Sequence, residues 1–287
     1  MTVRIRPGVA VFIALVAIAG LGLYVGKRDW GVDIKLPTVA RRCTVQADGQ
    51  VTLDASQMAN AATIAAIGIR RQMPERAVVV ALATALQESK LENLAGGDRD
   101  SIGLFQQRPS QGWGTPEQIR DPRYASTKFY TALNKVRGWE DMRVTDAAQR
   151  VQRSAFPNAY EKWADESAVL AKALLGNATG AVACSIDGEP AVRGLAAAEA
   201  LGANLRLDWG KLEVAAPAEL IGLAVPAGSP QAGWRYAHWL VSHATDHGIK
   251  RVRFGDLEWT ADEGNWSRID ASSAESGQVI AEVHTDA

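Results

Sequence analysis

The residues with the clearest potential for chemistry begin at the end of an apolar run. Glu88 and Ser89 close the segment AVVVALATALQES, whose composition predicts a buried helix. The carbonyl end of a helix and apolar surroundings both disfavour a carboxylate, so the position favours the protonated form of Glu88. A carboxyl group that keeps its proton near neutral pH can act as a general acid on a glycosidic oxygen. The alternative is a glutamate that only surfaces at a helix end.

A long irregular segment follows this helix. It reads LENLAGGDRDSIGLFQQRPSQGWG, and a loop of this length within a compact helical domain is usually functional. Trp113 stands between two glycines, where its flat face is available to stack on a sugar ring; the alternative is an ordinary core residue. Asp98 and Asp100 precede the GLFQ stretch, and we interpret them as solvated turn residues rather than as a second catalytic carboxylate.

Two short motifs in this region resemble the lysozyme-like superfamily of lytic transglycosylases and goose-type lysozymes. The signature of that superfamily is Glu-Ser at the end of a buried helix, followed one loop later by Gly-Leu-Met-Gln. This chain has QES at 87–89 and GLFQ at 103–106. The resemblance covers residues 50–176 and implies cleavage of the β-1,4 bond between N-acetylmuramic acid and N-acetylglucosamine in peptidoglycan.

The resemblance also implies a role for each matching position. Glu88 would be the catalytic acid and, in transglycosylase chemistry, also the base. Ser89 would orient the catalytic region through hydrogen bonds. Gly103 would permit a close backbone approach, and Gln106 would hydrogen-bond the sugar or steady the loop.

A third motif of the superfamily, Ala-Tyr-Asn-Gly, is altered here. The chain reads AFPNAY at 155–160, and Tyr160 is the candidate replacement for the active-site tyrosine. A lytic transglycosylase needs no second carboxylate, because the 6-hydroxyl of the sugar attacks, whereas an inverting hydrolase does. We therefore favour a transglycosylase over a lysozyme. The alternative to both is a catalytically silent glycan-binding or scaffold protein.

Helices are predicted to position these residues. Asp54 and Gln57 form a capping box that opens a helix running to Arg70. The buried helix before Glu88 starts near Glu75. Further helices are expected to start at Thr115, Asp121 and Thr145, and a last one to run from Ala159 to Leu175.

The N-terminus contains an apolar run, VAVFIALVAIAGLGLYV at 9–25, flanked by basic residues. Its length fits the roughly 17–25 residues that a membrane-spanning helix needs. We predict a single-pass anchor with the bulk of the chain extracellular. The alternative is secretion after cleavage of a signal peptide at the small residues Ala17 and Ala19.

The two cysteines, Cys43 and Cys184, follow the anchor and bracket the predicted glycan-cleaving domain. Because the ends of a domain often lie close together, a disulfide between them is reasonable, and it favours an oxidising exterior. Two unrelated buried thiols are the alternative.

After Cys184 the pattern changes to mixed helices and strands, with VRF-GD-LEW as a two-residue hairpin. The stretch GWRYAHWLVSHATDHGIK followed by RVRFGDLEW resembles, more loosely, a C-terminal module of actinobacterial cell-wall proteins related to zinc-dependent D,D-peptidases. The metal-binding motifs of active relatives are missing, which implies a non-catalytic wall-binding or spacing module. His243 and His247 share one helix face, and we interpret that face as solvated rather than metal-binding.

Composition sets the remaining limits. The chain has 287 residues, a net charge of −1 and 47% apolar residues. It contains no basic run interleaved with aromatic residues, so nothing in the sequence predicts nucleic-acid binding. We expect peptidoglycan strands and the membrane as partners, with no metal or organic cofactor. The predicted fold class is α+β: an N-terminal transmembrane helix, a mainly α-helical lysozyme-like domain and a small α+β domain. The predicted segments are a cytoplasmic tip at 1–8, an anchor at 9–26, a stalk at 27–48, a lysozyme-like domain at 49–184, an α+β accessory module at 185–275 and a flexible tail at 276–287.

Overall fold

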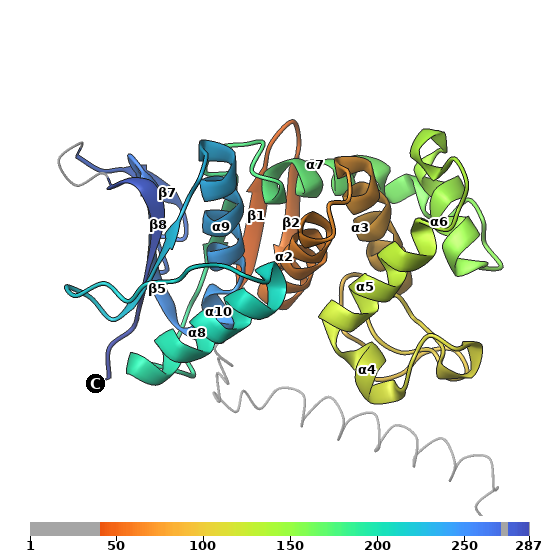
Figure 1. Ribbon diagram of the computed structural model, residues 1–287, viewed down its shortest axis with the longest axis horizontal. Coiled ribbons are helices and arrows are strands. Elements are labelled where there is room, and N and C mark those ends of the chain that lie inside the picture. Colours follow the sequence, from red (N-terminus) through yellow and green to blue (C-terminus); the bar gives the residue numbers. More distant parts are fainter. Residues whose placement is uncertain (1–40, 271–274, 287) are drawn as a thin grey trace, which may run out of the picture. The chain divides into compact units, whose positions relative to one another are not determined.

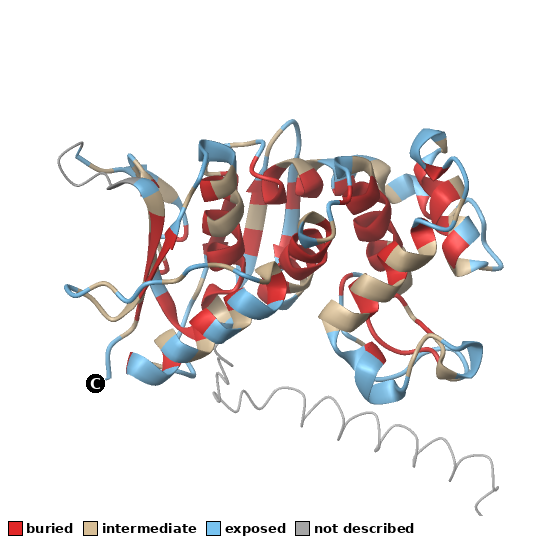
Figure 2. Ribbon diagram, in the orientation of Figure 1, coloured by how far each residue is buried: buried red, intermediate tan, exposed pale blue. Residues whose placement is uncertain are grey.

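The computed structural model describes residues 41–270 and 275–286, which form an α+β fold (Figure 1). Two antiparallel sheets and the helices around them share one continuous hydrophobic core. Buried residues line the faces of α2, α3 and α9 that pack inward (Figure 2). The α+β class is thereby confirmed. The predicted transmembrane helix lies outside the described residues.

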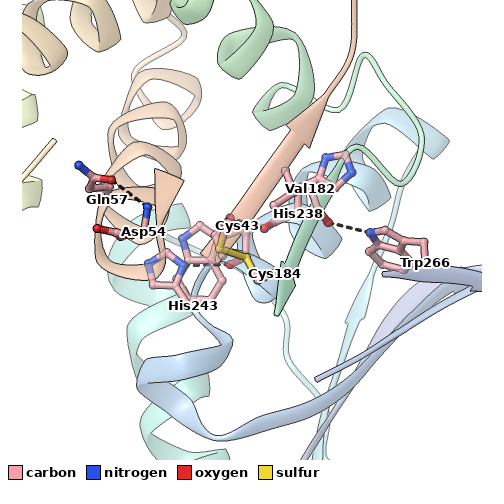
Figure 3. The surroundings of a disulfide bond; sticks show 10 residues. Cys43, Asp54, Gln57, Val182, Cys184, His238, His243 and Trp266 are labelled. Atoms are coloured by element: carbon pink, nitrogen blue, oxygen red, sulfur yellow. Dashed lines mark hydrogen bonds between the residues drawn. A yellow bond between two sulfur atoms is a disulfide. The ribbon is translucent and has the colours of Figure 1, made fainter. Parts of the chain in front are cut away.

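The first sheet has three strands and joins the two ends of the predicted glycan-cleaving domain. Strand β1 (Arg42–Gln46) lies between β2 (Gln50–Asp54) and β3 (Val182–Ser185). Cys43 and Cys184 are directly opposite each other on β1 and β3 and form a disulfide (Figure 3). The predicted pairing is confirmed. The predicted stalk is wrong at its end, because residues 42–46 are a paired strand.

Helix α2 (Ala55–Arg70) begins where predicted, since the Gln57 side chain accepts a hydrogen bond of 2.8 Å from the Asp54 backbone N–H. Helix α3 (Glu75–Ser89) packs against α2, α6 and α7. The helix predicted from Ala159 to Leu175 starts later than expected, because a 3₁₀ turn (Glu161–Trp163) takes the place of its first part. The other helices of this region are α4 (Pro116–Arg120), α5 (Pro122–Leu133), α6 (Val144–Gln152) and α7 (Ala164–Leu174).

The second sheet is built from the C-terminal third of the chain, with strand order β4-β8-β5-β6-β7. Phe254 and Leu257 pair across the turn between β5 and β6, which confirms the predicted hairpin. Its strands are β4 (Gly222–Pro226), β5 (Ile249–Gly255), β6 (Leu257–Thr260), β7 (Trp266–Arg268) and β8 (Glu275–Val283). The predicted flexible tail is wrong, because β8 pairs with both β4 and β5.

The helices of the C-terminal third are α8 (Gly194–Trp209), α9 (Pro230–Ser242) and the short α10 (Ala244–His247). Both α8 and α9 pack on α2. A buried polar network connects them: the Asp208 carboxylate accepts hydrogen bonds from Thr63 on α2 (2.9 Å), from Trp239 on α9 (2.7 Å) and from Arg123 on α5 (2.5 Å). The core is therefore shared across residue 184.

Residues 41–270 and 275–286 include no helix with the length and apolar character needed to cross a bilayer. The apolar run at 9–25 falls outside this part of the chain, so the anchor stays a prediction.

Candidate functional site

Helix α3 places Glu88 in its last turn. The helix ends because Lys90 adopts a left-handed backbone conformation with φ of 58°. Glu88 is half-buried, and its Oε1 accepts a hydrogen bond of 2.6 Å from the Tyr160 hydroxyl. Burial and the hydrogen bond to Glu88 both raise the pKa of Tyr160 above its ordinary value, so this hydroxyl remains a donor at neutral pH. Tyr160 is thus held against the candidate acid.

Ser89 connects the QES segment to the GLFQ segment. Its buried hydroxyl donates to the backbone carbonyl of Leu104 at 2.7 Å, and it also lies 3.1 Å from the Ala85 carbonyl. Leu104 belongs to the GLFQ stretch, so this contact ties the loop to the carboxyl end of α3. The side chain of Ser89 thus holds this part of the loop against the end of α3, next to Glu88.

The GLFQ stretch has a constrained backbone. Gly103 has φ of 76°, and a Cβ atom at this position would lie 2.8 Å from the carbonyl oxygen of Ile119. Gln106 has φ of 47°, and its Nε2 donates to the Gly103 carbonyl at 3.2 Å. Phe105 is fully buried and stacks on Phe129. Gly103 therefore permits a close approach between the backbones of the loop and of α4, and Gln106 both steadies the loop and faces the cavity described next.

A cavity of about 480 Å³ opens beside Glu88. Gln106 and Trp113 line it together with Glu88, so three of the predicted site residues share one cavity. Ser89, Gly103 and Tyr160 do not line the cavity. They form hydrogen bonds with Leu104, Gln106 and Glu88, respectively, and so support the residues that line it or lie next to it.

Sequence reasoning missed several residues of the cavity wall. Arg99, Arg108 and Arg153 line it, as does Phe156, whose relative exposure is 73%. Arg99 and Arg153 have left-handed backbones with φ of 57° and 54°. Such conformations in residues other than glycine are uncommon and cluster at functional sites. Arg99 and Arg108 belong to the loop and Arg153 follows α6, and no short motif marks the three together.

The two aspartates of the loop differ in environment. Hydrogen bonds from the Ser110 amide and the Arg108 guanidinium hold the pKa of Asp100 well below its usual range. Asp100 therefore acts as a structural anion within the loop. Asp98 is exposed and lines the cavity that contains Glu88.

Gln87 and Trp163 support the site from the side of α7. The Trp163 indole N–H donates to the Gln87 side-chain oxygen at 3.0 Å, and the Lys90 ammonium lies 3.9 Å from the centroid of the Trp163 ring. These contacts connect the end of α3 to the turn that carries Tyr160, so the hydrogen bond between Tyr160 and Glu88 has a firm framework.

The interpretation of His243 and His247 as a solvated face is wrong. Their relative exposures are 6% and 8%, because the His243 ring stacks on Trp239 and His247 stacks in turn on His243. Burial lowers the pKa of both rings. In the part of the chain that the structure describes, no three metal-ligating side chains come together.

The assembled site offers a half-buried carboxyl group, a tyrosine hydroxyl bonded to it, and a cavity large enough to admit a sugar. Such an arrangement suits proton transfer to a bound ligand. No protein-family model matches this chain, and no curated protein sequence matches it.

Proposed function

We propose that this protein cleaves the β-1,4 bond between N-acetylmuramic acid and N-acetylglucosamine in peptidoglycan, for remodelling of the cell wall. The observation that carries the proposal is the placement of Glu88. It lies half-buried on a cavity of about 480 Å³, with its Oε1 held by Tyr160 at 2.6 Å. The motifs QES and GLFQ, joined through Ser89, support it.

In the proposed reaction, Glu88 donates its proton to the glycosidic oxygen as the bond from that oxygen to the anomeric carbon breaks. The hydrogen bond from the Tyr160 hydroxyl to Oε1 holds the Glu88 side chain in place during this step. In the transglycosylase reaction the Glu88 carboxylate takes the proton of the sugar's 6-hydroxyl, whose oxygen attacks the anomeric carbon. The product is a 1,6-anhydro sugar, and Glu88 is protonated again.

A lysozyme-type reaction would use water in place of the 6-hydroxyl. Asp98 is the other carboxylate that lines the cavity, and it would be the group that activates this water. The high exposure of Asp98 favours the transglycosylase, because an exposed carboxylate is poorly positioned to hold a single water molecule.

The proposed location is the outer face of the membrane, with residues 9–26 as the anchor; secretion after signal cleavage is the alternative. The disulfide between Cys43 and Cys184 supports an oxidising compartment. Mass measurement of the mature N-terminus separates the two, because cleavage near Ala19 removes the first part of the apolar run.

The decisive experiment compares the clearing of purified peptidoglycan by the unmodified chain, by Glu88→Gln and by Glu92→Gln. Glu92 is exposed and lies just beyond α3, so it is a matched control for loss of one carboxylate. We expect Glu88→Gln to lose about 100-fold or more of the activity, as removal of a general acid does, and Glu92→Gln to keep it. Equal activity in all three proteins would refute the role of Glu88.

The alternative is a catalytically silent glycan-binding or scaffold protein of the envelope, favoured by the altered third motif at 155–160. Absence of clearing by every variant, with retained binding to peptidoglycan, would support it. Where clearing occurs, mass spectrometry of the released fragments identifies the chemistry: 1,6-anhydro ends indicate a transglycosylase, and reducing ends indicate a hydrolase.

A further inference from the structure

A second cavity adjoins the one that contains Glu88. It has a volume of about 750 Å³ and lies along α5 and α6. Gln111, Trp113, Gln152 and Arg153 line both cavities, so the two are neighbouring parts of one groove. Trp113 stands at the junction.

The lining of this second cavity is strongly cationic. Lys128, Lys135, Arg150 and Arg153 contribute to it, and its wall, drawn from the described residues, includes no aspartate or glutamate. The whole chain has a net charge of −1, so this concentration of positive charge is local. A concave surface lined by charges of one sign raises the local concentration of ligands of the opposite sign.

Ion pairs within the described part of the protein do not neutralise these four cations. Among residues 41–270 and 275–286, none of the four takes part in a salt bridge. Asp146 forms its ion pair with Arg143, and Arg150 makes only a smaller contribution to the lowered pKa of Asp146. The carboxyl end of α6 favours the nearby Arg150 and Arg153, whereas Lys128 lies within α5, 5.2 Å from the Tyr124 ring. The four charges remain available to a ligand.

We propose that this cationic arm of the groove binds carboxylate groups carried by the side chains of the glycan strand, one or more sugars away from the bond beside Glu88. The inference rests on the proposed function and names its substrate class: acidic, carboxylate-bearing glycan in preference to a neutral polymer with the same backbone. The four cationic side chains of the arm are exposed or half-buried, so they are free to adjust their positions. Such a set suits a flexible ligand with several carboxylates better than a single rigid ligand.

The test measures binding rather than cleavage, in the full chain carrying Glu88→Gln, so its outcome does not depend on turnover. The probe is a soluble peptidoglycan fragment, used before and after its carboxylates are converted to neutral amides with a carbodiimide and glycinamide. We expect amidation to weaken binding roughly tenfold, since several exposed ion pairs of modest strength are lost together, and high salt to remove most of the difference.

The same measurement is repeated with Lys128, Lys135, Arg150 and Arg153 changed to glutamine. We expect this variant to bind the carboxylated fragment as weakly as the protein with its four cations intact binds the amidated fragment. Arg137→Gln is the matched control, because Arg137 is exposed and directly follows the lining residue Val136 but does not itself line the groove. Equal binding of the carboxylated and amidated fragments by the unmodified groove would overturn the proposal. An oligothymidylate that competes with the glycan fragment and binds as tightly would also overturn it, because it would indicate a nucleic-acid site.

Discussion

Acidification should destabilise this protein through one buried ring, His238. The ring is fully buried, its Nδ1 lies 2.7 Å from the Ala173 carbonyl, and its Nε2 lies 2.9 Å from the Ala181 backbone nitrogen. Because the Ala181 N–H donates to Nε2, the proton of the neutral ring is on Nδ1. A second proton would face that N–H with no acceptor. Burial accordingly lowers the pKa of His238 from 6.5 to about 4.

The size of the effect follows from this shift. A drop from 6.5 to about 4 corresponds to about 3–4 kcal/mol at about 1.4 kcal/mol for each pKa unit, most of which is lost by pH 4. Below pH 6.5 the unfolded chain takes up a proton that the folded chain refuses until about pH 4. The contribution of His238 to stability is therefore complete above pH 6.5, and it is lost as the pH falls through this window.

Urea unfolding above pH 6.5 and near pH 4 measures the loss, and His238→Gln isolates the share of His238. Glutamine does not titrate, so we expect the variant to lose about 3 kcal/mol less on acidification than the unmodified chain does. His243 and His247, whose pKa values are also lowered, contribute to both proteins and cancel in the difference. An unchanged pH dependence in the variant would refute the assignment.

Three further perturbations test the framework, each by urea unfolding. Changing both Cys43 and Cys184 to serine should lower the free energy of unfolding by about 5 kcal/mol, because the bridge closes a loop of 141 residues; a change below about 1 kcal/mol would contradict this. Gly103→Ala should cost about 1–3 kcal/mol, since φ is 76° and the new Cβ would meet a backbone carbonyl of α4 at 2.8 Å; unchanged stability would exclude this backbone. Asp208→Ala should cost about 3–5 kcal/mol, because it leaves Arg123 without its buried partner, and a neutral effect would show that the pair is not formed.

Local rules of the sequence determined the elements that depend on neighbouring residues. The capping box of Asp54 and Gln57, the start of α5 at Asp121 and the hairpin around Gly255 were predictable, because each involves contacts within a few positions. The buried helix that carries Glu88 in its last turn was predictable too, from its apolar composition alone. These features locate the candidate acid and the loop that follows it.

Long-range packing decided the rest, because periodicity says which residues are apolar but not which distant segments meet. Tyr160 reaches Glu88 across 72 positions, and no local signal indicates that contact. The segment predicted as a flexible tail forms β8, which lies between β4 and β5 with its backbone groups paired on both sides and with Val279, Ala281 and Val283 fully buried. The cationic arm likewise exists only because the turn after α5 and the end of α6 fold around one cavity. The sequence by itself singled out Glu88 as the candidate acid; the tertiary structure decided its hydrogen-bond partner and the charge of the groove beside it.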